Sequence, residues 1–280
     1  MRTVTLKSVL ERAVGLDGVT ALTADDRTAL GMLLNAWVRW GWLFHWWPEA
    51  METEERAFRA EWSAIDYAAG AEVYHANAYW TALAGASAAQ EPGTAEEWTA
   101  LSNFAAYVGW TQTGETVIPP DGVRAVYRED PTIYERARRL NWRHHKLGVL
   151  VHGRVVPATV FVEFRREVPV FGLTPYDATE AISTGSRRYV DDTGECYLAL
   201  QDGTGNNPTT ATDYWEKVDF PEWLQAYVAQ GLYADTLRGA GQTSKSLAET
   251  GYGESILERE VEIFEMAGAG RIPRRVGFRS

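Results

Sequence analysis

Adjacent carboxylates are the residues of this chain whose types come closest to catalysis. The pairs are Asp25 and Asp26, Glu96 and Glu97, and Asp191 and Asp192. Glycoside hydrolysis does use two carboxylates, but they have to face each other across a cleft. Neighbouring acids on a helix or a turn usually point to solvent. We therefore expect no catalytic residue among them, and we expect that the protein is not an enzyme.

Metal and phosphate patterns are equally weak. The doublet His144-His145 lacks the i,i+4 spacing of helical ligands, and adjacent side chains on a strand diverge. The single cysteine, Cys196, excludes a multi-cysteine metal site and a disulfide within the chain. Residues 203–207 contain two glycines but lack the Lys-Ser/Thr of a phosphate loop, so they resemble a turn. We expect neither a metal ion nor a cofactor.

Charge and length exclude further classes. The 280 residues suggest about two domains. With 27 bases and 38 acids, the net charge of −11 argues against a general nucleic-acid binder and against adsorption to anionic membranes. The first residues contain no apolar stretch of the signal-peptide type, which predicts a protein that is intracellular when it is synthesised.

Tryptophan is the most unusual feature of the composition, with twelve residues. Six aromatic residues gather in the second half of a predicted helix over 24–47, and these are our candidates for a subunit interface: Trp37, Trp40, Trp42, Phe44, Trp46 and Trp47. A tryptophan-rich core is the alternative. A membrane span is disfavoured because Asn35, Arg39 and His45 would lie in the hydrocarbon layer.

Periodicity predicts helices at both ends of the chain and strands between them. Helices are expected over 3–15 and 24–47, after a cap at Asp219, and over 243–266 with an interruption near Gly251. Strands are expected over 123–127 and 158–166, and a hairpin around Gly153 is expected over 149–156. Residues 271–280 should form an extended arm, whose docking residues would be Arg271, Arg274, Arg275, Phe278 and Arg279.

An internal repeat is the strongest signal in the sequence. Ala82 and Ala199 are 117 residues apart, and so are Trp98 and Trp215. The Thr-Ala pairs between them, at 94–95 and 210–211, are 116 apart, so one shift of a single residue aligns the copies. Each copy predicts two short strands, a Pro-containing loop and a Trp that closes a very small core. A unit of about forty residues is marginal alone and needs a partner surface.

The pattern of strand, Tyr-x-Ala-Leu, loop and Trp resembles the small chitin- and cellulose-binding modules of bacterial hydrolases and short β modules of phage virion proteins. The resemblance implies exposed rings that stack on sugars. The candidate platform residues are Tyr79, Trp80, Tyr197 and Tyr214. Adjacent residues on a strand point to opposite faces, so one of Tyr79 and Trp80 should be exposed. Trp98 and Trp215 are expected to fill the module cores.

These elements predict an α+β fold. A discontinuous helical bundle from the N- and C-terminal helices should carry a central antiparallel β region and two small inserted β modules. The expected domains are 1–60 with 220–280 for the helical core and its arm, 61–104 for the first module, 105–172 for the β region and 173–219 for the second module.

This arrangement resembles the head–tail connector proteins of tailed bacteriophages, also called adaptor or head-completion proteins. The residues that carry the resemblance are 6–10, 24–47, 221–237, 243–266 and 271–280, with the motifs Trp46-Trp47-Pro48-Glu49 and 218–223. Simple adaptors lack the large β insertions, so another neck or tail component remains an alternative.

The resemblance implies a virion protein made in the host cytoplasm. It would form a ring, commonly of twelve copies, beneath the portal protein and above another neck or tail protein. DNA would pass through its channel without sequence-specific binding, and no membrane would be involved. The second hypothesis is a carbohydrate-binding protein that uses the aromatic platforms of the repeated modules.

Overall fold

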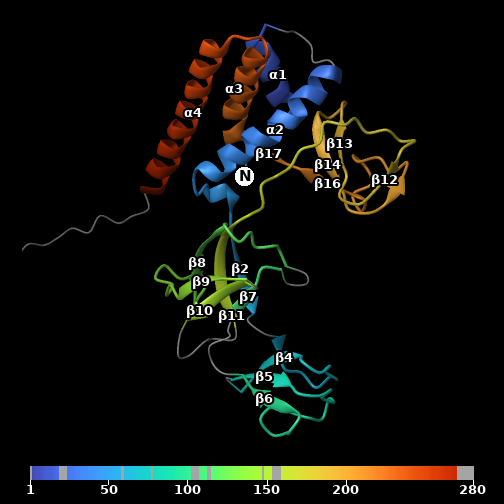
Figure 1. The fold of residues 1–280 in the computed structure, drawn as a ribbon, viewed down its shortest axis with the longest axis vertical. Coiled ribbons are helices and arrows are strands. Elements are labelled where there is room, and N and C mark those ends of the chain that lie inside the picture. Colours follow the sequence, from blue (N-terminus) through green and yellow to red (C-terminus); the bar gives the residue numbers. More distant parts are fainter. Residues whose placement is uncertain are drawn as a thin grey trace, which may run out of the picture. The chain divides into compact units, whose positions relative to one another are not determined.

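The computed structural model of the chain is an α+β protein with two compact units (Figure 1). It describes residues 2–18, 24–57, 60–76, 78–101, 107–111, 115–146, 148–152 and 159–269. The first unit combines Met1–Trp47 with Val168–Ser280, and the second is Pro48–Glu167. The chain therefore begins the first unit, builds the second, and returns to complete the first.

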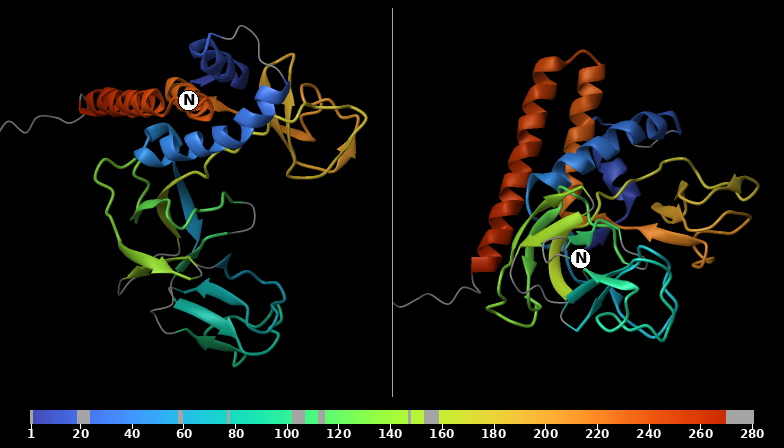
Figure 2. Two further views of the ribbon diagram at one scale, coloured as in Figure 1. Left: turned by 45° about the horizontal axis from the view of Figure 1, so that its top comes forward. Right: turned by 60° about the horizontal axis from the view of Figure 1, so that its bottom comes forward.

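Helices from both ends of the chain form the core of the first unit. Within the described residues they are α1 (Leu6–Leu16), α2 (Ala24–Phe44), α3 (Glu222–Gly239) and α4 (Thr243–Ala269). The central helix is α3, which packs against the other three, and α4 runs alongside it (Figure 2). Strand β1 (Thr3–Val4) pairs antiparallel with β17 (Phe220–Pro221). The predicted discontinuous bundle is confirmed.

Local contacts explain where the helix boundaries differ from the predicted ones. The Thr5 side chain caps α1 by accepting a hydrogen bond from the backbone N–H of Ser8 at 3.3 Å, so the helix begins later than expected. The cap position of α3 is Pro221, which is held in β17, and not Asp219. The expected interruption at Gly251 is absent from α4, which is continuous over its described length.

Two small β modules share one fold. Module 1, in the second unit, consists of β3 (Ala60–Glu61), β4 (Glu72–His75), β5 (Ala78–Ala82) and β6 (Trp98–Ala100). Module 2, in the first unit, consists of β12 (Ala181–Ile182), β13 (Arg187–Val190), β14 (Glu195–Ala199), β15 (Gly203–Thr204) and β16 (Trp215–Val218). The strand orders β4-β5-β6 and β13-β14-β16 correspond, and the strands within each of these two sets pair antiparallel.

The hydrogen bonds of the two modules correspond as well. The N–H of Gly70 donates to the carbonyl of Ala82 at 2.7 Å, as the N–H of Gly185 donates to the carbonyl of Ala199 at 2.8 Å. Both glycines have a positive φ, of 81° and 83°, which a side chain would strain. The register pairs Ala82 with Trp98 and Ala199 with Trp215. The predicted repeat is thus a structural repeat.

Each module is closed by its repeated tryptophan, as predicted. Trp98 and Trp215 are each 5% exposed. Their indole N–H groups donate to loop carbonyls, of Gln90 at 2.7 Å and of Asn206 at 2.8 Å. One ring therefore fills the core and fixes the loop at the same time, which a unit with so few apolar residues needs.

The structural repeat begins earlier than the repeat in the sequence. The N–H of Trp62 donates to the carbonyl of Tyr74, and the N–H of Tyr176 donates to the carbonyl of Tyr189, both at 2.8 Å. In module 1 this segment is β3, which runs parallel to β4, and in module 2 it forms a parallel bridge between Pro175 and Tyr189. Main-chain hydrogen bonds are compatible with many side chains, so this first strand of each module does not give a recognisable sequence match.

The rest of the second unit is two three-stranded antiparallel sheets. The first is β2 (Met51–Ala57), β11 (Thr159–Arg165) and β8 (Val123–Tyr127), and the second is β7 (Tyr107–Gly109), β10 (Gly148–His152) and β9 (Asn141–His145). A short 3-10 helix, Pro48–Ala50, precedes β2. The core holds Val126, Val149 and Phe164, and Tyr79 of module 1 belongs to the same cluster.

The units divide the chain differently from the predicted domains. The N-terminal helical part ends at Trp47 and not at residue 60, because 51–57 form β2 and pair with β11. Module 2 belongs to the same unit as the helices. The N–H of Lys7 in α1 donates to the carbonyl of Gly194 at 2.9 Å, and Arg27 in α2 forms an ion pair with Asp191. Module 2 is therefore anchored to the bundle.

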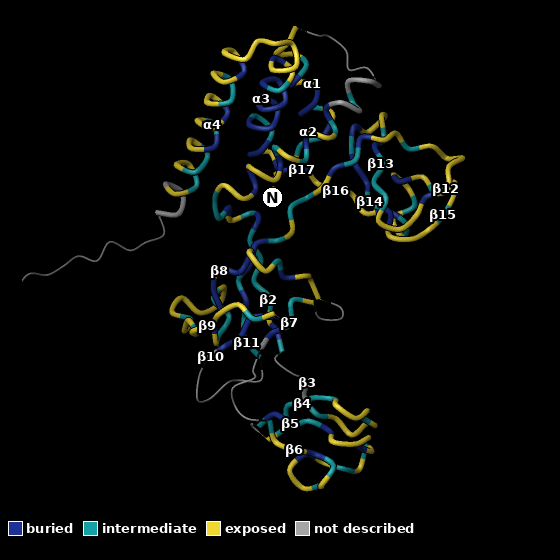
Figure 3. Tube along the Cα trace, in the orientation of Figure 1, coloured by how far each residue is buried: buried dark blue, intermediate teal, exposed yellow. Residues whose placement is uncertain are grey.

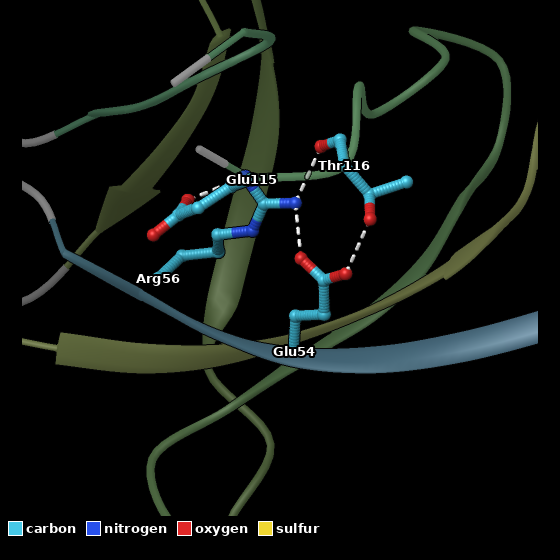
Figure 4. Close-up of polar contacts among 4 residues, drawn as sticks. All are labelled: Glu54, Arg56, Glu115 and Thr116. Carbon is cyan, nitrogen blue, oxygen red and sulfur yellow. Dashed lines mark hydrogen bonds and ion pairs between the residues drawn. The ribbon is translucent and has the colours of Figure 1, made fainter. Parts of the chain in front are cut away.

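A buried arginine fastens the segment before β8 to β2. Arg56 is fully buried and forms ion pairs with Glu54 and Glu115 (Figure 4). It also donates to the carbonyl of Thr116, whose hydroxyl donates to Glu54. A buried guanidinium needs such partners because its desolvation is costly. The network is structural, since its carboxylates are engaged by the arginine and the hydroxyl.

Candidate interaction surface

The inner face of α2, which is turned toward the core of its unit, carries buried apolar residues at regular intervals. Leu30, Leu34, Val38 and Trp42 recur every four residues, and all are buried. The two helices approach closely at Gly41, where an added Cβ would lie 2.4 Å from Leu224. The absence of a side chain there allows the backbone of α2 to lie on α3.

Trp37 lies on the backbone of α3. An added Cβ at Gly231 would lie 2.2 Å from its ring, and the ring meets Tyr227 edge-on at 5.5 Å between centroids. The indole N–H of Trp37 donates to Asp235 at 2.7 Å. Burial raises the pKa of the Tyr227 phenol, with a further contribution from the charge of Glu254. Trp37 is therefore fixed by packing and by a polar anchor.

A stack of three tryptophans joins the end of α2 to the start of α3. Trp223 stacks on Trp47 at 4.2 Å and on Trp42 at 6.0 Å between ring centroids. The indole N–H of Trp47 donates to the carbonyl of Gly41 at 2.8 Å. This return of the chain explains why α2 ends at Phe44 although aromatic residues continue to residue 47.

The six interface candidates therefore divide into two sets. Trp42 and Trp47 are 3% and 0% exposed, so they belong to the core of the chain itself and are not available to a neighbouring subunit. Trp37 and Trp46 are half-buried. The exposed candidates are Trp40, at 71%, and Phe44, at 47%. All twelve tryptophans lie in described segments, and Trp40 alone has an exposed side chain.

Trp40 is the centre of a wider apolar surface along α2, which we call the α2 stripe. Its exposed members are Met32, Leu33, Ala36, Trp40, Leu43 and Phe44. Residues 33, 36, 40 and 43 follow the alternating three- and four-residue spacing of a helix–helix seam. Met32, at 80%, is even more exposed than Trp40. Exposed apolar patches of this kind are typical of interaction sites.

A second, different surface lies on the face of α4 that is turned away from α3, which we call the α4 outer face (Figure 3). It exposes Leu247, Tyr252 and Ile263. The exposed charged residues of the described part of α4 are the acids Glu254, Glu258, Glu262 and Glu265 and the bases Lys245 and Arg259. Both surfaces are therefore partly apolar; the α2 stripe carries the exposed base Arg39, and α4 exposes more acids than bases.

The structure does not support the predicted sugar platform. Tyr79 and Tyr197 are each 8% exposed, so neither presents a ring face to solvent. Trp80 is half-buried, donates its indole N–H to the carbonyl of His75 at 3.1 Å, and packs against Gly93. Tyr214 is half-buried too. The strand does alternate as expected, but both of its faces are covered.

The structure also bears on the metal-binding and thiol candidates. Among the described residues, no group of three His, Cys, Asp or Glu side chains could hold a metal ion. Asp191 is paired with Arg27. Cys196 is buried, accepts a hydrogen bond from the N–H of Gly172 at 3.3 Å, and has a pKa that burial raises, so it is not a reactive thiolate. No helix in the described segments is long and apolar enough to cross a membrane.

The predicted docking arm, with Arg271, Arg274, Arg275, Phe278 and Arg279, lies outside the described residues. Searches with family models, among curated proteins and among solved structures find no match to this chain. The resemblance to phage connectors therefore rests only on the sequence segments and motifs named above.

Sequence analysis missed a basic surface in the second unit. From residue 136 to residue 162 the chain has six bases and no acid, although its net charge is −11. A count of charge along the chain would have found it. The net charge of the whole chain concealed it, because residues 48–123 hold twelve acids and two bases.

Proposed function

We propose that this chain is a structural protein of a tailed-phage virion that assembles into a ring at the head–tail junction, as an adaptor beneath the portal. The observation that carries the proposal is the α2 stripe, with Trp40 at its centre and 71% exposed. A solvent-exposed Trp within an apolar seam is costly unless a partner covers it. The discontinuous helical bundle, which the connector resemblance implies, supports the same assignment.

A ring requires two different surfaces on each subunit. When the same patch meets itself, assembly stops at a dimer, whereas head-to-tail contact between two unlike patches continues until the ring closes. The α2 stripe and the α4 outer face are unlike. Both are partly apolar, but the α2 stripe carries the base Arg39, whereas the described part of α4 exposes four acids and two bases. We therefore assign the subunit contact to the α2 stripe of one copy and the α4 outer face of the next.

Cysteine cross-linking tests this contact, and the chain offers a clean background because its only cysteine is buried. Ala36 on the α2 stripe and Ser255 on the α4 outer face are both exposed. The double variant Ala36→Cys/Ser255→Cys should form a ladder of oligomers on mild oxidation. Each single variant should give no ladder. Cross-linked dimers of Ala36→Cys alone would show that the stripe meets itself, which contradicts a ring.

Negative-stain microscopy tests the ring itself. Wild-type protein, alone or mixed with the portal, should give closed rings, and Trp40→Ser should abolish them. The matched control is Leu83→Ser, which removes an apolar side chain that is 64% exposed on module 1. A tagged copy in virions should be labelled at the head–tail junction. Label elsewhere on the particle would overturn the adaptor assignment but not the ring.

A further inference from the structure

A basic surface in the second unit is separate from the proposed subunit contact. Residues 124–167 carry ten bases and five acids, in contrast to the acidic segment before them. Two antiparallel runs of chain form this surface, β8 with its end and the residues that lead into β9. The N–H of Arg128 donates to the carbonyl of Arg138 at 2.9 Å, and the N–H of Leu140 donates to the carbonyl of Val126 at 2.8 Å.

The bases of this surface are exposed. Of the acids beside them, Glu129 and Asp130 are engaged by a turn, whereas Glu135 is exposed. Within the part of the chain that the structure describes, no ion pair is found for Arg128, Arg136, Arg138, Arg143 and Lys146, all of which are exposed. Glu129 accepts a hydrogen bond from the backbone N–H of Arg138 at 2.9 Å. Asp130 accepts from the N–H and the hydroxyl of Thr132, at 2.8 and 2.6 Å. These carboxylates serve the main chain of a turn and do not pair with the arginines.

Two further arginines are linked to the Glu163 carboxylate, one directly and one through a tyrosine hydroxyl. Arg124 donates to Glu163 at 2.9 Å, the Tyr127 hydroxyl donates to the same carboxylate at 2.9 Å, and Arg139 donates to that hydroxyl at 3.2 Å. The Arg139 guanidinium also lies over the Tyr127 ring, 5.5 Å from its centroid. The hydrogen bond to Tyr127 raises the pKa of Arg139. The network therefore holds two arginines in place and leaves the surface with a positive excess.

Strand β9 turns its charge outward. Trp142 packs against the core of the unit, and its neighbour His144 meets it edge-on at 5.2 Å. Arg143 points to the opposite face of the strand and is exposed. Exposed Ile133 and Tyr134 border the same region. The region combines several exposed guanidinium groups with the exposed side chain of Tyr134, and arginine and tyrosine side chains contact phosphate and sugar in nucleic-acid complexes.

We infer that this basic surface binds the phosphate backbone of duplex DNA without reading its sequence. Duplex DNA carries one negative charge per about 1.7 Å of axis, which satisfies several closely spaced arginines at once. Planar guanidinium groups match phosphate geometry. An acidic protein is the less fitting partner, because separated carboxylates do not supply such a density of charge. The acidic remainder of the chain repels DNA and confines the contact to this surface.

Fluorescence anisotropy with a labelled duplex of about 30 base pairs, roughly three helical turns, tests the inference on the full chain. With five unpaired bases in contact, the logarithm of the binding constant should fall with the logarithm of salt concentration with a slope of about −4 to −5. The binding constant should then drop about 500-fold between about 50 and 200 mM salt. Duplexes of unrelated sequence should bind equally.

Two matched variants make the test specific, and each removes four exposed bases. The patch variant replaces with Gln the residues Arg136, Arg138, Arg143 and Lys146. The control variant replaces with Gln the residues Arg2, Arg12, Lys245 and Arg259 in the first unit. The patch variant should reduce the salt slope to about −1 and weaken binding at least about tenfold at low salt. The control should keep the wild-type slope, and both should keep the wild-type melting temperature.

Three outcomes would overturn the inference. They are an absence of wild-type binding at low salt, equal losses in the patch and control variants, and binding of labelled polyglutamate as tight as that of the duplex. The last result would assign the surface to an acidic protein. None of these outcomes bears on the proposed ring, because the patch residues lie outside the α2 stripe and the α4 outer face.

Discussion

The contact between Trp37 and Gly231 gives a sharp prediction for the packing of α2 on α3. In Gly231→Ala the new Cβ would lie 2.2, 2.5 and 2.6 Å from three ring atoms of Trp37. Carbon atoms prefer about 3.5–4.0 Å, so the ring would have to move by about 1 Å or more. The hydrogen bond to Asp235 and the edge contact with Tyr227 oppose that movement.

The expected size follows from two opposing contributions. Gly→Ala in a helix interior gains about 0.8–1 kcal/mol of helix propensity. Overpacking costs about 1–3 kcal/mol, and a displaced indole that leaves the Asp235 carboxylate without its donor adds about 1–3 kcal/mol. We expect a net loss of about 1–5 kcal/mol in the free energy of unfolding, the difference of these terms. The control is Gly251→Ala in α4, where nothing lies within 4 Å and about 0.8–1 kcal/mol should be gained.

Urea unfolding followed by tryptophan fluorescence measures both variants. A double-mutant cycle isolates the contact, because Gly231→Ala should become stabilising once Trp37→Leu has removed the ring. The coupling free energy is the loss in the wild type plus the gain in the Trp37→Leu background, so it should be at least about 2 kcal/mol, at or above the upper part of the range that neighbouring residues show. If Gly231→Ala stabilised the wild type as much as Gly251→Ala does, Trp37 would not lie on α3, and the division of the tryptophans into core and surface would be wrong.

Three further predictions concern the second unit and the modules. Arg56→Met should lower the free energy of unfolding by about 3 kcal/mol, because it leaves Glu54 and Glu115 without their cation. Replacing both glutamates with Gln in the same variant should recover most of the loss in a melting experiment. Burial, and then the charge of Glu54, raises the pKa of Glu52 above its unfolded value of 4.5. The folded state therefore favours the protonated carboxyl, and stability should fall as pH rises from 4.5 through the folded pKa. Melting temperatures measured over this pH range should show the fall in the wild type and lack it in Glu52→Gln. Trp98→Leu and Trp215→Leu should each cost about 3 kcal/mol, as for other large-to-small core changes, and hydrogen exchange should locate each loss in the substituted module alone.

The amphipathic elements could be predicted from the sequence, because burial sets their periodicity. Leu6, Val9 and Leu10 form the buried face of α1 as expected. The repeat could be predicted as well, since the positions that match, Ala82 with Ala199 and Trp98 with Trp215, are those where the small cores tolerate little change. These positions accept few other residues because they are buried in very small cores, and so the two copies still match there in the sequence.

The division of the tryptophans could not be predicted. A helix that is apolar on nearly all sides has no polar face to set its rotation, so the pattern does not say which rings turn inward. The partners that decide it are Asp235 for Trp37 and Trp223 for Trp42 and Trp47, and they lie nearly two hundred residues away in the chain. The burial of Tyr79 could not be predicted for a related reason, because residues of the β sheets of its own unit, distant in the sequence, pack against it.

The discontinuous bundle imposes an order on synthesis. The apolar residues of α2 leave the ribosome early, but their covering helix ends only at Gly239. At about 5–20 residues per second, roughly 10–40 s pass between the two events. The second unit can fold in that interval, while the nascent α2 stays uncovered and prone to premature association. A chaperone that holds this segment during translation should therefore raise the yield of soluble protein more than one added after release.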